Sequence, residues 1–253
     1  MESYRPMNEL EQKSSMHFWW PVIQKLGIDA PKTKEVPLAK HEIFALASER
    51  IPKTVVRKIE ATAKEFGTPF FLRTDLSSGK HSWVKTYFVN SIGNLDRHIY
   101  EIISHHLLAD IFGIPFSSFF VREYIPLESY FTAFWGDMPV AKERRYFIKD
   151  SKVQCHHEYW VEGAVREGME RKGIPESDWL PKLRNLNREE AKEVEELSNI
   201  AAKVGRHFDG YWSVDFAKAK DGRWLLIDMG KGEISYHKPD CEFAIHEGRV
   251  ERI

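Results

Sequence analysis

Residues 212–229, with the sequence WSVDFAKAKDGRWLLIDM, predict a β-hairpin on which the interpretation of the whole chain depends. Two apolar runs flank Asp221-Gly222, which is the strongest two-residue hairpin turn signal in the sequence. A two-residue loop at that position sets a register in which Asp215 lies opposite Asp228. Residues that face each other in this way lie on the same side of the sheet, with Cβ atoms roughly 5 Å apart. The hairpin is therefore expected to hold two carboxylates close together.

Two like charges directly opposite each other destabilise a sheet, so the pair Asp215 and Asp228 needs compensation. A divalent cation would provide it, because two carboxylates suit Mg²⁺, which takes its other ligands from water and phosphate. One alternative is a bulge that turns one of the two acids toward solvent. Another is a lysine or arginine that neutralises the pair. The spacing of the two residues leaves these alternatives open.

The composition limits the class of protein. The 253 residues suit one domain with two lobes, and the 42% of apolar residues can form a substantial core. A formal net charge of -1 provides no overall attraction to nucleic acid or to a membrane surface. The cysteines lack a CxxC spacing, no apolar run approaches about 18 residues, and the N-terminus lacks the apolar region of a signal peptide. We therefore expect a cytoplasmic protein with no nucleic-acid or membrane partner.

The order of the predicted elements favours an α+β fold with antiparallel sheets. Helical spacing of apolar residues predicts helices over residues 16–28, 40–66, 94–113 and 187–207, the second of them interrupted near its middle. Runs of β-branched and aromatic residues predict strands over residues 70–75, 83–89, 117–126, 130–135, 143–150 and 152–160. Strands and helices do not alternate strictly, which argues against a parallel sheet.

Two cations in the first half of the chain suit a nucleotide phosphate. Arg73 follows the apolar residues 70–72, so a rigid strand would hold its guanidinium, which can bind phosphate oxygens with two hydrogen bonds. Lys80 follows the small residues 77–79, whose backbone N–H groups can approach a phosphate closely. The loop is not a P-loop, because the GxxxxGK[ST] pattern is absent. A solvated surface charge is the alternative for both residues.

Two further strands offer polar groups to a ligand. One predicted strand runs into a proline and can present backbone groups to an adenine, with Glu123 or Glu128 available for other polar atoms. Another begins with a glutamate followed by Arg144 and Arg145. Successive strand residues point to opposite faces, so only one of these two arginines is expected to enter a cleft.

Taken in order, these pieces resemble the ATP-grasp superfamily over about residues 68–237. The shared order is a cationic strand, a small-residue loop with a cation, a helix, the hinge strand VREYIP, an ExR strand, a long helix and VDF…DGRWLLID. The arrangement is similar to the branch with an arginine in place of the first nucleotide-binding lysine, near the eukaryotic cell-division-cycle assembly chaperones. The resemblance implies two lobes, each with an antiparallel sheet and helices, and a nucleotide between them. We expect an N-terminal helical segment over residues 1–67, an N-lobe over 68–125 and a C-lobe over 126–253.

The resemblance also implies roles for the basic residues. Arg73 and Lys80 take the places of the two phosphate-binding residues, so both are expected to bind the cofactor. Glu143 and Arg145 match the ExR strand; we assign Glu143 to nucleotide binding and Arg145 to steadying the transferred phosphate. Arg73 and Arg145 are therefore the expected catalytic residues.

Adenine and the metal ion are assigned in the same way. Glu123, Tyr124 and Ile125 match the hinge that receives adenine in ATP-grasp proteins. Asp215 and Asp228 match the two acidic Mg²⁺ ligands, so the expected cofactors are ATP and Mg²⁺.

One departure from the family pattern concerns the metal site. The second acid usually stands in an ExN or DxN pattern, whereas here it stands in DMG, with Gly230 in place of the asparagine. The resemblance implies an ATP- and Mg²⁺-dependent ligase that joins a small-molecule or peptide carboxylate to an amine through an acyl-phosphate. The alternative is an ATP-binding assembly chaperone or interaction module with a protein partner and no ligase turnover. A nucleic-acid end-modifying role shares little beyond the use of ATP.

Other polar residues have weaker assignments. Ser235 and His237 lie just past the metal strand and are candidates for the acceptor side, against a purely structural loop. The sequence Cys155-His156-His157 is the only ligand-like cluster. Adjacent strand residues point to opposite faces, so we expect no three-ligand site within that strand.

Overall fold

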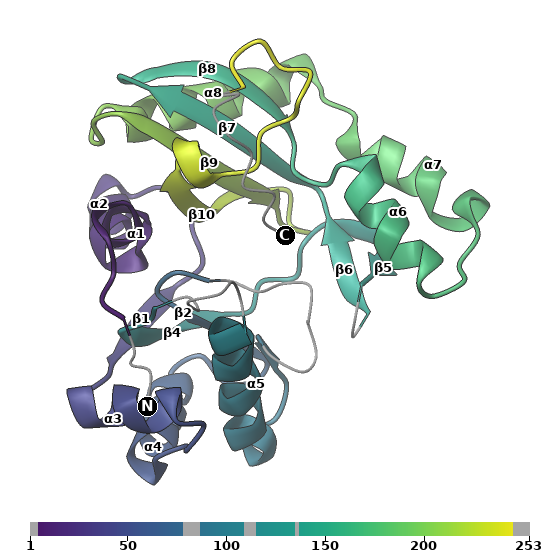
Figure 1. Ribbon diagram of the computed structural model, residues 1–253. Helices are drawn as coiled ribbons and strands as arrows, with labels where there is room; N and C mark the ends of the chain where they lie inside the picture. Colours follow the sequence, from purple (N-terminus) through teal and green to yellow (C-terminus); the bar gives the residue numbers. More distant parts are fainter. Residues whose placement is uncertain (1–4, 78–86, 109–114, 135–136, 245–253) are drawn as a thin grey trace.

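The computed structural model describes residues 5–77, 87–108, 115–134 and 137–244. Figure 1 shows two lobes, one around strands β1 to β4 and the other around strands β5 to β10. Each lobe contains a four-stranded antiparallel sheet, and the second lobe also has a two-stranded ribbon. The expected α+β class is confirmed. Within the described ranges, no helix is both long and apolar enough to cross a membrane.

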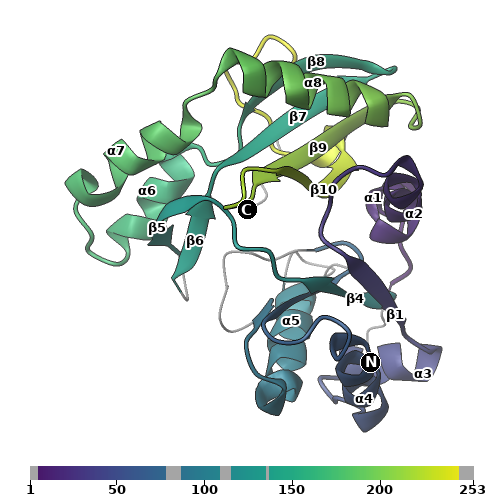
Figure 2. The same cartoon turned by 180° about the vertical axis from the view of Figure 1, so that it is seen from behind.

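The first lobe is built on a sheet with the strand order β1-β4-β2-β3. Its strands are β1 (Thr33–Pro37), β2 (Phe70–Thr74), β3 (Phe88–Val89) and β4 (Ser118–Glu123). The helices α3 (Lys40–Ala47), α4 (Lys53–Ala63) and α5 (Leu95–Leu108) lie on one side of this sheet, and a 3-10 turn (Ile92–Asn94) precedes α5 (Figures 1 and 2). Strands and helices share one apolar core, which includes Leu46, Val55, Ile59, Leu72, Ile99, Ile102 and Val121.

The second lobe is built on a sheet with the strand order β10-β9-β7-β8. Its strands are β7 (Glu143–Lys149), β8 (Lys152–Glu158), β9 (Tyr211–Lys218) and β10 (Trp224–Lys231), and a 3-10 turn (Gly232–Ile234) follows. The long helix α8 (Ala191–Gly205) packs on one face, as Figure 2 shows. That face is apolar, with Tyr146, Ile148, Val214, Phe216 and Leu226 in a core shared with Leu197 and Val204 of the helix. The opposite face is left for polar residues.

A smaller unit extends from the second lobe. It consists of the ribbon β5 (Ser129–Ala133) and β6 (Met138–Ala141) with the helices α6 (Glu162–Glu170) and α7 (Glu176–Asn187). Its own apolar cluster includes Val140, Trp160, Met169, Trp179 and Leu183.

Residues before β2 contribute to both lobes. The N-terminal helices are α1 (Glu9–Ser14) and α2 (Met16–Leu26). Trp19 and Ile23 of α2 belong to the core of the second lobe, whereas β1 pairs with β4 in the first. The division at residues 67 and 125 stays a prediction, and residues from the predicted N-terminal segment contribute to both cores.

The hairpin turn differs from the predicted one. The N–H of Ala219 donates to the carbonyl of Arg223 at 2.8 Å, so the loop has three residues, Lys220, Asp221 and Gly222. Gly222 has a φ of 92°, a left-handed conformation that glycine adopts at little cost and that a three-residue hairpin loop requires. The predicted two-residue turn is therefore wrong.

A β-bulge in β10 restores the predicted pairing of the acids. Next to the loop, Trp224 pairs with Lys218, one residue out of the predicted register. The register shifts between Leu226 and Asp228, and beyond that shift Asp228 lies opposite Asp215. The predicted pairing of the two aspartates is confirmed, because a longer loop and a bulge each move the register by one residue and cancel.

Candidate functional site

A row of polar residues crosses the open face of the second sheet. Asp228 of β10 lies opposite Asp215 of β9, and Asp215 lies opposite Arg145 of β7. Arg145 in turn lies opposite His157 of β8. Residues next to this row in sequence, such as Val214, Phe216 and Tyr146, belong to the core under α8. The alternation of side chains along a strand therefore places the whole row on the other side.

Asp215 is neutralised within its own sheet. Its two carboxylate oxygens accept hydrogen bonds from Nε and Nη2 of Arg145, at 2.7 and 2.8 Å. Arg145 also donates to the carbonyl of Tyr236 at 3.1 Å and lies over the ring of Tyr159. Burial alone would lower the pKa of Arg145, but the charge and hydrogen bonds of Asp215 raise it above its ordinary value. An arginine therefore offsets part of the repulsion between the two acids.

Asp228 is neutralised from the other lobe. Nη1 of Arg73, on β2, lies 3.0 Å from Oδ1 of Asp228. The Arg73 side chain is buried at 3% exposure and donates through Nε to the carbonyl of Thr74, whereas the Asp228 side chain is 22% exposed. This ion pair joins the two sheets at the site, and its acidic member remains accessible.

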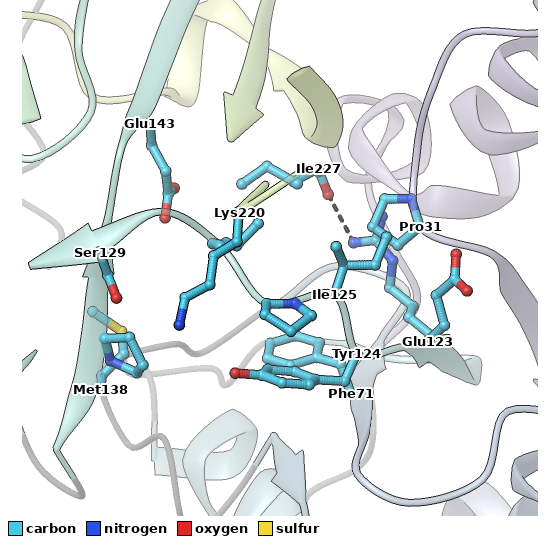
Figure 3. A pocket seen from close by; sticks show the side chains of 14 residues that line it. Pro31, Phe71, Glu123, Tyr124, Ile125, Ser129, Met138, Glu143, Lys220 and Ile227 are labelled. Carbon is cyan, nitrogen blue, oxygen red and sulfur yellow. Dashed lines mark hydrogen bonds between the residues drawn. The ribbon is translucent and has the colours of Figure 1, made fainter. Parts of the chain in front are cut away.

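A second buried arginine reaches the same place and was not assigned from the sequence. Nη1 of Arg122, on β4, donates to the carbonyl of Ile227 at 2.7 Å, shown as the dashed line in Figure 3. Its Nε donates to Oγ1 of Thr33 at 3.0 Å, and its Nη2 is buried with no hydrogen-bond partner among the described residues. Burial and the neighbouring Arg73 lower the pKa of Arg122, against the opposing effect of Asp228. The signal was present in the sequence, as a charged residue inside the apolar strand FFVRE.

A cavity of about 170 Å³ lies between the lobes beside these arginines. The predicted adenine strand forms one wall, with Glu123, Tyr124 and Ile125, and the opposite wall includes Glu143 and Ile227 (Figure 3). The carboxylate of Glu123 accepts the backbone N–H of Lys32 at 2.7 Å, which fixes its direction. Phe71 and Met138 add apolar surface. The cavity is thus largely apolar, with a few polar groups, as a purine ring requires.

Lys220 is another cavity residue that the sequence did not reveal. Its backbone N–H donates to the carbonyl of Pro126 at 2.9 Å, and Leu127 forms a β-bridge with Ala219. The hairpin loop therefore lies against the strand that precedes the second lobe, and the Lys220 side chain points into the cavity (Figure 3). The sequence pattern shows this residue only as a neighbour of the turn.

Several other candidates lie elsewhere. Lys80 falls outside the described residues. Arg144 faces away from the row and pairs with Glu193 at 2.8 Å, so its neighbour Arg145 alone points to the site. Glu128 accepts a hydrogen bond from the hydroxyl of Tyr130 at 2.9 Å. Arg144 and Glu128 thus have structural partners away from the two aspartates.

The two acceptor-side candidates also have partners. Ser235 lies 2.6 Å from the hydroxyl of Ser213 and donates to the carbonyl of Lys231 at 2.9 Å. Nε2 of His237 lies 3.1 Å from Sγ of Cys155. The structural alternative therefore describes Ser235 well, and His237 belongs to a separate cluster.

A two-lobed fold with antiparallel sheets, an apolar cavity between the lobes and a paired acidic site leads to a family. A family model of the ATP-grasp domain, described as clade family 3, matches residues 64–245. The chain belongs to the ATP-grasp family. Among curated proteins, none matches this chain.

Solved structures show the same ATP-grasp fold. C-terminally truncated Cdc123 from Schizosaccharomyces pombe has a TM-score of 0.58 and 16% identity, covering 88% of this chain and 84% of its own. Cdc123 from the same organism has a TM-score of 0.57 and 14% identity, covering 89% and 86%. D-alanyl-alanine synthetase A from Vibrio cholerae has a TM-score of 0.49 and 11% identity, covering 87% and 56%.

The aspartates suit the Mg²⁺ ion that ATP-grasp folds typically bind. Hard carboxylate oxygens are the preferred ligands of this ion, and the register brings two of them to adjacent positions. Each oxygen of Asp215 accepts one hydrogen bond from Arg145 and has a second lone pair for a cation. The contacts of Asp228 with Arg73 and with the N–H of Met229 both fall on Oδ1. Gly230 lies on the same face, two residues on, and has no side chain to contribute.

Proposed function

We propose that the chain binds ATP·Mg²⁺ between its lobes and uses it to join a carboxylate to an amine through an acyl-phosphate. The observation that carries the proposal is the meeting of Asp215 and Asp228 with three largely buried arginines at one edge of the apolar cavity. Anionic phosphates and a divalent cation are the ligands that such a mixture of charges can hold together.

Two ends of the site suit two parts of the nucleotide. Its adenine would lie against Tyr124 and Ile125, where the wall of the cavity is apolar. The phosphates would point toward Arg73 and Arg122, whose guanidinium groups lie at the junction of the cavity and the acids. Glu143 lines the same cavity and is proposed to contact the nucleotide's polar atoms. Lys80, outside the described residues, would add charge at the phosphates.

The chemistry needs position and charge more than a nucleophile. The substrate carboxylate attacks the γ-phosphate, ADP leaves, and an amine then displaces phosphate from the acyl-phosphate. Mg²⁺, held by Asp215 and Asp228, supplies charge neutralisation on the phosphates. Arg73 and Arg145 hold the acids in place and face the charge that develops on the transferred group. Arg145 is the more rigid of the two, because two hydrogen bonds to Asp215 and one to Tyr236 fix its plane.

Nucleotide binding is tested first. A non-hydrolysable ATP analogue at a hundred times its Kd should stabilise the protein by about 2.7 kcal/mol, which raises Tm by roughly 5–10 °C for a chain of this size. The increase should require Mg²⁺ and should disappear in Asp228→Asn. Asp221→Asn, in the exposed turn of the same hairpin, is the matched control and should keep the shift. A full Mg²⁺-dependent shift in Asp228→Asn would show that the site lies elsewhere.

Turnover is tested separately by ADP release. ADP should accumulate only when a pool of carboxylates and a pool of amines are added together, and Arg145→Lys should slow it at saturating ATP. Release that depends on neither pool would contradict the ligase proposal and leave the binding proposal standing.

An ATP-binding assembly chaperone or interaction module is the second candidate, favoured by Gly230. A glycine at this position removes a metal ligand that ligases of the family usually have. A Cβ added at Gly230 would meet Oγ of Ser235 and Ser213 at 3.5 and 3.7 Å, so space allows a side chain there. If the second candidate holds, ATP·Mg²⁺ binds and no combination of carboxylate and amine releases ADP. Gly230→Asn should then tighten Mg²⁺-dependent ATP binding.

A further inference from the structure

A second group of possible metal ligands lies at the far edge of the same sheet face. Among the described residues, Sγ of Cys155, a ring nitrogen of His237 and Sγ of Cys241 all lie within 4.8 Å of one another. Cys155 is on β8, whereas His237 and Cys241 belong to the segment that follows β10. The cluster brings together residues separated by about a third of the chain.

The strand geometry explains why the sequence motif alone did not reveal this group. His156 points to the opposite face of β8, where its ring stacks on Tyr146 and its Nδ1 lies 3.0 Å from Glu189. Cys155 and His157 share the other face because they are two residues apart. As predicted, the strand does not hold three ligands by itself. The chain after β10 supplies the others.

Both histidines of this face have the tautomer that binds metals. Nδ1 of His157 lies 2.8 Å from the carbonyl of Glu158, and Nδ1 of His237 lies 3.3 Å from the carbonyl of Lys238. A carbonyl only accepts, so Nδ1 is the protonated nitrogen and Nε2 carries the lone pair. A backbone carbonyl on the second nitrogen is the usual outer partner of a metal-bound histidine.

His157 supplies an independent sign of a missing ligand. It is 7% exposed, and its Nε2 has no hydrogen-bond partner among the described residues. Its ring centroid lies 5.4 Å from that of His237, beside the cluster. A buried acceptor without a donor costs about 1–3 kcal/mol, and a bound cation at this position would remove that cost.

We propose that Cys155, His237 and Cys241 bind one Zn²⁺ ion, with His157 as the fourth ligand. Two sulfurs and two imidazole nitrogens are the ligand set of a closed, tetrahedral structural zinc site. In a tetrahedral site, sulfur and nitrogen ligands stand roughly 3.6 Å apart, given the usual zinc bond lengths. The Sγ of Cys155 and Nε2 of His237 are 3.1 Å apart, so an ion between them requires only a small side-chain adjustment.

The ion would attach the segment after β10 to the edge strand β8. Zn²⁺ binds thiolates, so the two protons of the cysteines leave as the ion enters. The site differs from the acidic pair Asp215 and Asp228, whose oxygens suit Mg²⁺. Zinc binding is therefore independent of the proposed function and can be tested without nucleotide.

The unaltered chain provides the first test, because it contains only these two cysteines. Reduced protein, freed of metal, is titrated with Zn²⁺ against a chromophoric chelator, and its thiols are then alkylated and counted by mass spectrometry. We expect one Zn²⁺ per chain and protection of both cysteines. Binding of no Zn²⁺ by the reduced chain would overturn the proposal, as would protection that appears only without reductant, which indicates a disulfide. Co²⁺ in place of Zn²⁺ should give the absorption bands of a tetrahedral thiolate site.

Variants then identify the ligands. Cys155→Ser and His237→Ala should each weaken Zn²⁺ binding by more than about 100-fold, and His157→Ala by roughly 10–100-fold. His156→Ala, on the other face of the same strand, is the matched control and should bind as the unaltered chain does. The Co²⁺ spectrum is a second measurement for any variant that is less stable. An unchanged Co²⁺ spectrum in Cys155→Ser would contradict the assignment.

Discussion

Two arginine–aspartate pairs lie side by side at the ATP-grasp site, and they are built differently. Arg145 and Asp215 come from neighbouring strands of one sheet and share two hydrogen bonds, at 2.7 and 2.8 Å. Arg73 and Asp228 come from different lobes and meet through one contact at 3.0 Å. The Asp215 side chain is 6% exposed and the Asp228 side chain 22%. One pair is part of a sheet, and the other spans the space between lobes.

The difference suggests a division of labour. Loss of either member of the pair within the sheet leaves a largely buried charge uncompensated, so this pair must persist when ligands come and go. The cross-lobe pair can be exchanged at lower cost, because its acid already contacts solvent. Entry of ATP·Mg²⁺ would then move Arg73 from Asp228 to a phosphate while the metal ion takes its place on the acid.

The largest expected effect is on the pair within the sheet. Asp215→Ala should reduce the free energy of unfolding by about 3–5 kcal/mol, because Arg145 is left largely buried without its partner. Chemical denaturation monitored by tryptophan fluorescence measures the change. Asp215→Asn keeps the shape and one acceptor and should lose less. A loss below about 1 kcal/mol in Asp215→Ala would remove the distinction between the two pairs.

An intermediate effect is expected at Arg122, beside the cross-lobe pair. Arg122→Leu should weaken binding of an ATP analogue by about 10–150-fold, which corresponds to the 1.5–3 kcal/mol of a hydrogen bond to a charged group. Calorimetric titration measures it. Arg97→Leu, on the exposed face of α5, is the control and should leave the affinity unchanged. Equal affinities in both variants would place the phosphates away from β4.

The smallest effect on folding is expected at the cross-lobe pair itself. Without nucleotide, Asp228→Asn should change the free energy of unfolding by no more than about 1 kcal/mol, since one member of the pair is partly exposed. The same denaturation measurement applies, with Asp221→Asn as the control. A destabilisation comparable to that of Asp215→Ala would mean that Arg73 depends on Asp228 as strongly as Arg145 depends on Asp215.

The sequence was most informative where alternation fixes the direction of side chains. It placed Asp215 opposite Asp228, separated Arg144 from Arg145, and identified the strand that lines the cavity. These statements need only the period of a strand and the position of a turn. The α+β class followed from the same patterns.

What the sequence could not reveal depends on contacts between distant segments. Arg122 appears as an ordinary charged residue until Ile227 is known to lie beside it, 105 positions later. The same holds for Cys155, which gains its meaning from residues 237 and 241. A single sequence contains no measure of such distances, because they are set by how the two lobes pack.

The cancelling loop and bulge give an exposed turn a hidden influence. A two-residue turn without a bulge would leave the same number of residues between Asp215 and Asp228, so comparison of related sequences by spacing would not distinguish the two hairpins. The bulge, however, turns the carbonyl of Ile227 out of the ladder toward Arg122. Inherited changes at Gly222 can therefore alter the contact between the lobes without touching either acid. A surface glycine that tolerates drift in most hairpins is here tied to the way the two lobes are held together.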